Sequence, residues 1–140
     1  MVDTPDKREE ILSRIADVLS PIGVPVERNR QLEIPEEDLP RIVLNDGGEE
    51  IAPPGNTPQG RMFMRWRMEP EIVYYLNPSD GVSVNKAYQS VLDVIRADAI
   101  LMGMLARDEG VSSVRFETYY ATGRTTLAGF RLTLTLIYDK

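Results

Sequence analysis

Residues 62–76, MFMRWRMEPEIVYYL, alternate between two kinds of side chain. The even positions are apolar or proline, and the odd positions include four charged residues, Arg65, Arg67, Glu69 and Glu71. This period-two pattern predicts a β-strand with one face buried and the other in water. At about 3.3 Å per residue the strand would reach roughly 50 Å, whereas a domain of this chain length is only about 35–40 Å across. We therefore expect it to bend at Pro70, because proline cannot donate a hydrogen bond to a neighbouring strand.

Helical spacing of apolar residues before this strand predicts a helix over residues 5–20, with Thr4 as its N-cap and Pro21 as its end. Two short extended runs follow, at residues 24–29 and 41–45. After the long strand, residues 82–106 return to helical spacing. After Asp98 we expect either a second short helix or a bent continuation of the first, with an end at Gly110.

Two more alternating strands complete the chain, one along residues 114–120 and one along 130–138, joined by a hairpin loop at 123–129. This order of elements predicts an α+β fold, with an antiparallel sheet of about four to five strands and two or three helices on one face. The 140 residues are expected to form one domain. Within it, Trp66 and Phe130 are expected in the core between the sheet and the helices.

The stretch from 46 to 60 is rich in proline and glycine and shows no periodicity. We interpret it as a mobile interaction loop that orders on contact with a partner. Its acidic residues Asp46, Glu49 and Glu50 could chelate a hard cation. Their spacing matches no EF-hand loop, however, and acids beside paired glycines are usually a solvated turn, so we predict no metal site.

The composition argues against an enzyme. The chain has neither cysteine nor histidine, which excludes thiolate nucleophiles, cysteine–zinc sites and serine–histidine triads. No phosphate-cradling motif is present, so we predict no catalytic residue and no cofactor. The net charge of −6 argues against binding to nucleic acid or anionic membranes. We found no apolar run long enough to cross a membrane and no signal peptide, so we expect the protein to fold in a cytoplasm.

The charged face of the long strand has two interpretations. It is either a solvated sheet face with cross-strand ion pairs or a polar strip that orients a neighbouring subunit at a ring boundary or lumen.

Several short segments resemble the tail terminator proteins of long-tailed phages, related prophages and gene transfer agents, in the minor tail protein U group. They are residues 8–12 (REEIL), 26–30 (VERNR) and 39–47 (LPRIVLNDG), the Gly123-Arg124 turn, and the alternating LTLTL strand at 132–136. The chain departs from that group in its central strand, which is rich in methionine, and in its proline-rich loop.

The resemblance implies a virion structural protein, assembled in the cytoplasm of a bacterial host. Such proteins form a hexameric homo-oligomer that caps the head-proximal end of the tail tube, ends tube polymerisation and offers a surface for head–tail joining. The implied partners are the tail tube protein and the head connector or neck protein, with DNA only passing through the ring lumen and no membrane contact. The expected interface residues are Asp46, Glu49, Glu50, Ile51, Arg65, Arg67, Glu69, Glu71 and Arg124.

Two other functions stay open. The protein could be a different neck or tail-completion protein, seated elsewhere in the head–tail connection. It could also be a small oligomeric ligand-binding domain or enzyme that uses acids and tyrosines alone, for which a deep pocket with converging acids would be needed.

Overall fold

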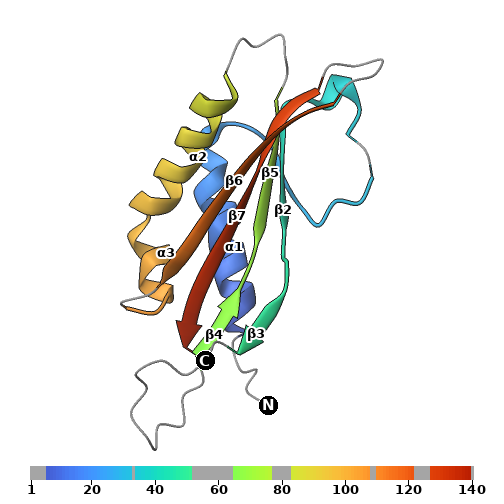
Figure 1. The fold of residues 1–140 in the computed structure, drawn as a ribbon. Coiled ribbons are helices and arrows are strands. Elements are labelled where there is room, and N and C mark those ends of the chain that lie inside the picture. Colours follow the sequence, from blue (N-terminus) through green and yellow to red (C-terminus); the bar gives the residue numbers. More distant parts are fainter. Residues whose placement is uncertain are drawn as a thin grey trace, which may run out of the picture.

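The structure is a computed structural model that describes residues 6–32, 34–51, 65–76, 83–107, 110–121 and 127–139. Its helices are α1 (Lys7–Leu19), α2 (Val84–Ala97) and α3 (Ala99–Met104), with short 3-10 turns at Ser20–Ile22 and Glu36–Asp38. Its strands are β1 (Val26–Arg28), β2 (Arg41–Asn45), β3 (Glu49–Ile51), β4 (Arg65–Met68), β5 (Glu71–Leu76), β6 (Val111–Ala121) and β7 (Leu127–Asp139). The helices lie on one side of a single, mostly antiparallel sheet (Figure 1), so the predicted α+β class is confirmed.

The sheet has seven strands in the described residues, more than the four to five expected. The difference arises because two long strands are each interrupted. β4 and β5 pair with β7 in one unbroken register, from Arg65 opposite Asp139 to Leu76 opposite Ala128. They are therefore one strand interrupted at Pro70, where the expected break occurs. β2 and β3 run beside them and are likewise two parts of one strand.

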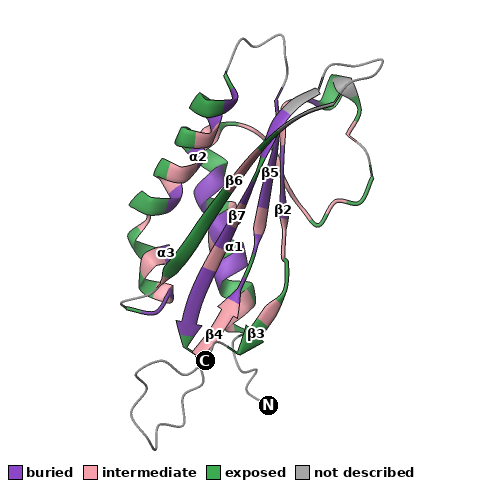
Figure 2. Cartoon of the chain, in the orientation of Figure 1, coloured by how far each residue is buried: buried purple, intermediate pink, exposed green. Residues whose placement is uncertain are grey.

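The core lies between the three helices and one face of the sheet (Figure 2). β7 contributes alternate residues that are fully buried: Phe130, Leu132, Leu134, Leu136 and Tyr138. The Phe130 ring packs against Tyr74 and Phe116, with ring centroids 5.5 and 5.6 Å apart. The prediction for Phe130 is therefore confirmed. Trp66 is only partly buried and packs at the margin of the core, because its strand lies near the end of the sheet.

The helix boundaries correct two expectations. α1 begins after Asp6, whose carboxylate accepts hydrogen bonds from the backbone N–H groups of Arg8 and Glu9, so the cap expected at Thr4 is wrong. The second helical region does break at Asp98, which caps α3 by accepting from Leu101 N at 2.8 Å. It ends at Met104 rather than at Gly110, which directly precedes β6.

Asp98 also holds α1 against the other two helices. Its carboxylate accepts from Arg14 Nε at 2.8 Å and from Arg14 Nη2 at 2.6 Å. The bonds from Arg14 lower the pKa of Asp98. The two-pronged contact fixes the angle between α1 and the α2–α3 corner.

Candidate functional site

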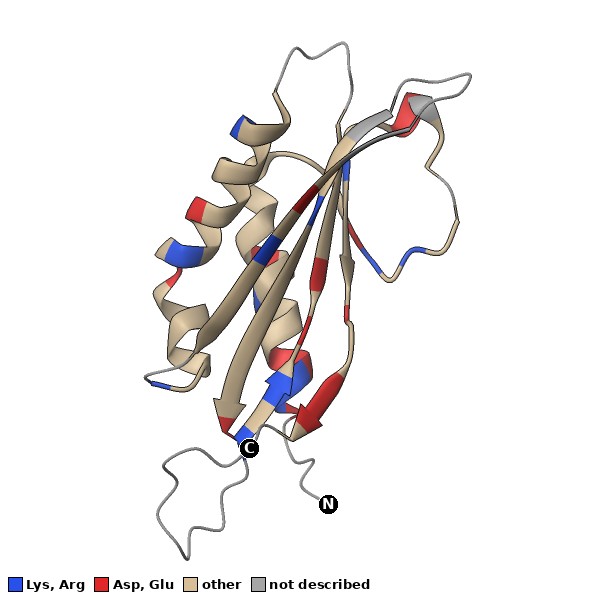
Figure 3. Ribbon diagram, viewed as in Figure 1, with Lys and Arg blue, Asp and Glu red and all other residues tan. Residues whose placement is uncertain are grey.

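Most of the residues that the sequence selected as an interface meet at one corner of the sheet, which we call the β3–β4 corner. It consists of residues 46–51 and 65–69. Within it, Glu49 lies opposite Met68, Glu50 opposite Arg67 and Ile51 opposite Trp66. Glu50 on β3 is therefore the acidic residue that directly faces a basic one, and Figure 3 shows the acidic positions of β3 running beside the basic positions of β4.

The corner corrects the prediction of a loop over 46–60, because Glu49–Ile51 form β3. Three residues are too few to show an alternating pattern, and two of them are charged, so no local pattern predicts a strand there. Residues 52–60 and Arg124 lie outside the described residues. Glu71 lies next to the corner on β5, where it accepts from Asn45 Nδ2 at 3.3 Å and pairs with Arg131.

A β-bulge builds the corner. Asn45 lies opposite Glu71 and Glu49 opposite Met68, so that three residues, 46–48, face only two, 69–70. The extra residue is accommodated at Gly47, which has a φ of 68°. A Cβ at this position would lie 2.0 Å from the Glu69 carbonyl oxygen, and only glycine lets the two backbones approach so closely.

The face of the sheet turned away from the helices, here called the open face, carries cross-strand ion pairs. Arg67 pairs with Glu50, Arg65 with Asp139 at 3.2 Å, and Arg131 with Glu71 at 3.3 Å. The side chains of these pairs are between 29% and 58% exposed, so each pair contributes little to stability. The predicted cross-strand ion pairs are therefore present. Contact with a neighbouring subunit stays a prediction.

A hollow of about 250 Å³ lies in the corner, lined by Gly48, Glu49, Glu50, Arg67 and Glu69. Its walls carry three carboxylates and one guanidinium, so it presents both signs of charge to solvent. Across the described part of the chain, no group of three or more acidic, histidine or cysteine side chains is arranged to hold a metal ion.

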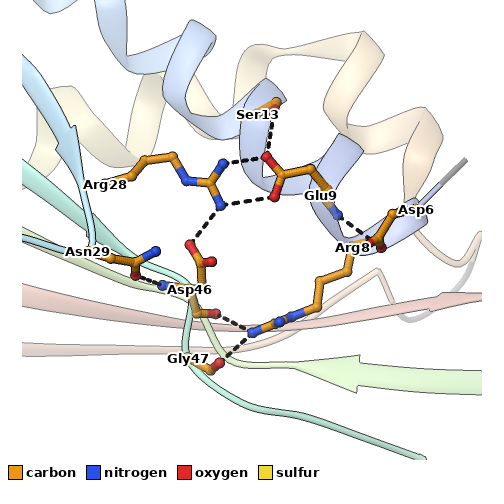
Figure 4. A network of polar contacts seen from close by, with 8 residues as sticks. All are labelled: Asp6, Arg8, Glu9, Ser13, Arg28, Asn29, Asp46 and Gly47. Atoms are coloured by element: carbon orange, nitrogen blue, oxygen red, sulfur yellow. Dashed lines mark hydrogen bonds and ion pairs between the residues drawn. The ribbon is translucent and has the colours of Figure 1, made fainter.

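A polar network behind the corner was not predicted from the sequence (Figure 4). Arg28 on β1 donates to both carboxylate oxygens of Glu9 on α1, and its Nη2 lies 2.8 Å from Asp46 Oδ1 in the bulge. Asp46 N donates to Asn29 Oδ1 at 2.9 Å. Arg8 donates to the backbone carbonyls of Asp46 and Gly47. We call these five side chains and Gly47 the bulge network.

The bulge network shifts the titration of its members. The hydrogen bond from Arg28 lowers the pKa of Glu9, although partial burial opposes it. Burial acts to raise the pKa of Asp46, but the bonds from Arg28 and Asn29 outweigh it and the net shift is downward. Both carboxylates in turn raise the pKa of Arg28. The network therefore favours the charged forms and anchors the bulge to α1 and β1.

No family model matches the chain, and no curated protein matches it. None of the helices in the described residues is long and apolar enough to span a membrane.

Proposed function

We propose that this protein is a structural subunit of a phage-like tail. It forms a hexameric ring at the head-proximal end of the tail tube, ends tube polymerisation and provides the surface to which the head connector binds. Its working location is the virion, and DNA passes through the ring without being bound.

The observation that carries this proposal is the β3–β4 corner. Residues chosen from the sequence at separate positions, such as Asp46, Glu50 and Arg67, lie together there on a bulge held in place by a polar network. Among the described residues, β3 has β4 on one side and no strand on the other, and Ile51 at its end is 52% exposed. A rigid, charged and exposed strand end suits contact with another protein.

A second observation supports the same function. The segments that resemble tail terminators include residues 8–12, 26–30 and 39–47, and members of all three meet in the bulge network through Arg8, Arg28 and Asp46. Three of the five segments that carry the resemblance therefore belong to one spatial unit of the molecule.

The test exchanges the charges of one ion pair at the corner. In Glu50→Arg/Arg67→Glu the pair between β3 and β4 is kept, so the protein should fold and melt as the wild type does. The charges offered to a partner are reversed, and the yield of complete particles should fall roughly tenfold or more. A matched control, Arg115→Glu/Glu117→Arg, exchanges an exposed ion pair on β6, at the opposite edge of the sheet from β3, and should assemble normally.

Electron microscopy of the particles separates the outcomes. Tails of uncontrolled length would support the proposed function as a tail terminator. Tails of normal length that fail to join heads would indicate another neck or tail-completion protein. Complete particles at normal yield from the Glu50→Arg/Arg67→Glu variant would overturn the proposal that the corner is an assembly surface.

A further inference from the structure

Strand β6 leaves a long edge of the sheet without a partner in the described residues. It spans 11 residues and pairs with β7 along one side only. Residues 111–115 are all exposed, and Val111 and Val114 are each 39% exposed (Figure 2). The strand contains no proline or lysine, residues that commonly protect an edge from pairing, and its one register irregularity lies at its start, between Val111 and Ser113. Such an edge is a template for another strand.

The sequence of β6 indicates which strand fits. Phe116 is the middle residue of Val111–Ala121, with Arg115 before it and Glu117 after it. If two copies of β6 pair antiparallel about a two-fold axis at Phe116, each Arg115 lies opposite Glu117 of the second copy. The opposite charges meet twice in one contact, and the overlap covers residues 113–119 of both strands, beyond the irregularity between Val111 and Ser113.

Neighbouring registers are much less favourable. A shift by two residues in one direction places Arg115 opposite itself, and a shift in the other direction places Glu117 opposite itself. Both put like charges directly across from one another, which is destabilising. A shift by one residue would pair residues of opposite faces, so that the open face of one copy would lie on the same side of the joined sheet as the helices of the other copy. The charges therefore select the register centred on Phe116.

The rest of the sheet continues the same pattern. Within one chain, Arg115 and Glu117 form an ion pair with each other on the open face, and at 74% and 43% exposure both stay accessible to a partner strand. Glu117 lies opposite Arg131 on β7, and Arg131 pairs with Glu71 on β5. In the paired sheet Glu117 would lie between Arg131 of its own chain and Arg115 of the second copy, so that the sign of charge alternates across the junction.

We propose that free subunits pair through β6 with a second copy of this chain, in an antiparallel two-fold contact centred on Phe116. This goes beyond the proposed function and rests on β6 alone. An isologous contact closes at two copies and does not build a ring. Pairing covers the exposed edge in the free protein and leaves the β3–β4 corner open.

The experiment measures the mass of the purified protein by sedimentation velocity over a concentration series from roughly 10 µM to 1 mM, the range expected for a small interface. The variants are Arg115→Glu, Glu117→Arg and the double exchange Arg115→Glu/Glu117→Arg. Lys7→Glu on α1 is the control for the change in charge. Circular dichroism checks that each variant is folded.

We expect a reversible dimer whose dissociation constant rises at least tenfold in each single variant. The double exchange should recover most of the lost affinity, because both copies carry the swapped charges, although position 117 then faces Arg131 within each chain. A wild type that stays monomeric throughout, a larger oligomer, or single variants that dimerise normally would each overturn the proposal. So would a double exchange that fails to restore pairing. None of these results depends on particle assembly, so they leave the proposed function to its own test.

Discussion

Replacing Gly47 with alanine would place a methyl group inside the bulge that builds the β3–β4 corner. At a φ of 68° a residue with a Cβ is strained by about 1–2 kcal/mol. The new Cβ would also lie 2.0 Å from the Glu69 carbonyl oxygen and 2.8 Å from its carbonyl carbon. These are backbone atoms, and the segment is held by bonds from Glu69 N to Gly48 O and from Leu134 N to Pro70 O. It cannot move aside without losing them, and forced overpacking adds about 1–3 kcal/mol.

We therefore expect Gly47→Ala to lower the free energy of unfolding by about 2–5 kcal/mol. Urea denaturation followed by the fluorescence of Trp66, which pairs with Ile51 across the corner, measures this change. Two controls separate the causes. Gly23→Ala has a positive φ but open space, and should cost about 1–2 kcal/mol. Gly48→Ala has neither feature and should stay within about 0.5 kcal/mol of the wild type. If Gly47→Ala were as stable as Gly48→Ala, the bulge geometry would be wrong.

Two further predictions concern the core and the bulge network. Phe130→Ala should cost about 3–5 kcal/mol because the ring is fully buried, and Trp66→Ala should cost clearly less, since Trp66 is only partly buried. Both are measured by urea denaturation followed by circular dichroism, because Trp66 is the one tryptophan of the chain. Folding lowers the pKa values of Glu9 and Asp46, so their charged forms stabilise the folded protein at any pH above their ordinary pKa values, near 4. This stabilisation is lost as the pH falls through their lowered pKa values in the folded protein. The stability gap between wild type and Arg28→Ala should accordingly shrink between about pH 5 and pH 2, and a gap independent of pH would contradict the network.

The period-two and helical patterns were sufficient to predict the fold class. They located both long C-terminal strands, the helix break at Asp98 and the interruption at Pro70, because burial of one face imposes these periods directly on the sequence. The strand count was wrong for a local reason. A bulge at Gly47 and a proline at position 70 each divide one long strand into two hydrogen-bonded segments.

The candidate site could be predicted only in part. The charged residues of 65–71 were identified because they alternate with apolar ones. The roles of Arg28 and Glu9 could not be found, since their bonds join residues 18 and 19 positions apart on different elements. Such contacts depend on how α1 packs beside β1, which no local pattern encodes. Asn29, with a φ of 53°, gives a weak signal at most, because asparagine tolerates this conformation more readily than most residues.

The location of the protein in purified particles distinguishes a ring at the head-proximal end of the tail from any other position. An affinity-tagged copy, decorated with gold and imaged by electron microscopy, should label one position per particle, at the junction of head and tail. Quantitative mass spectrometry of the same particles should give six copies per tail if the ring is hexameric. Particles that lack the protein, or label distributed along the tail or at its far tip, would contradict the account.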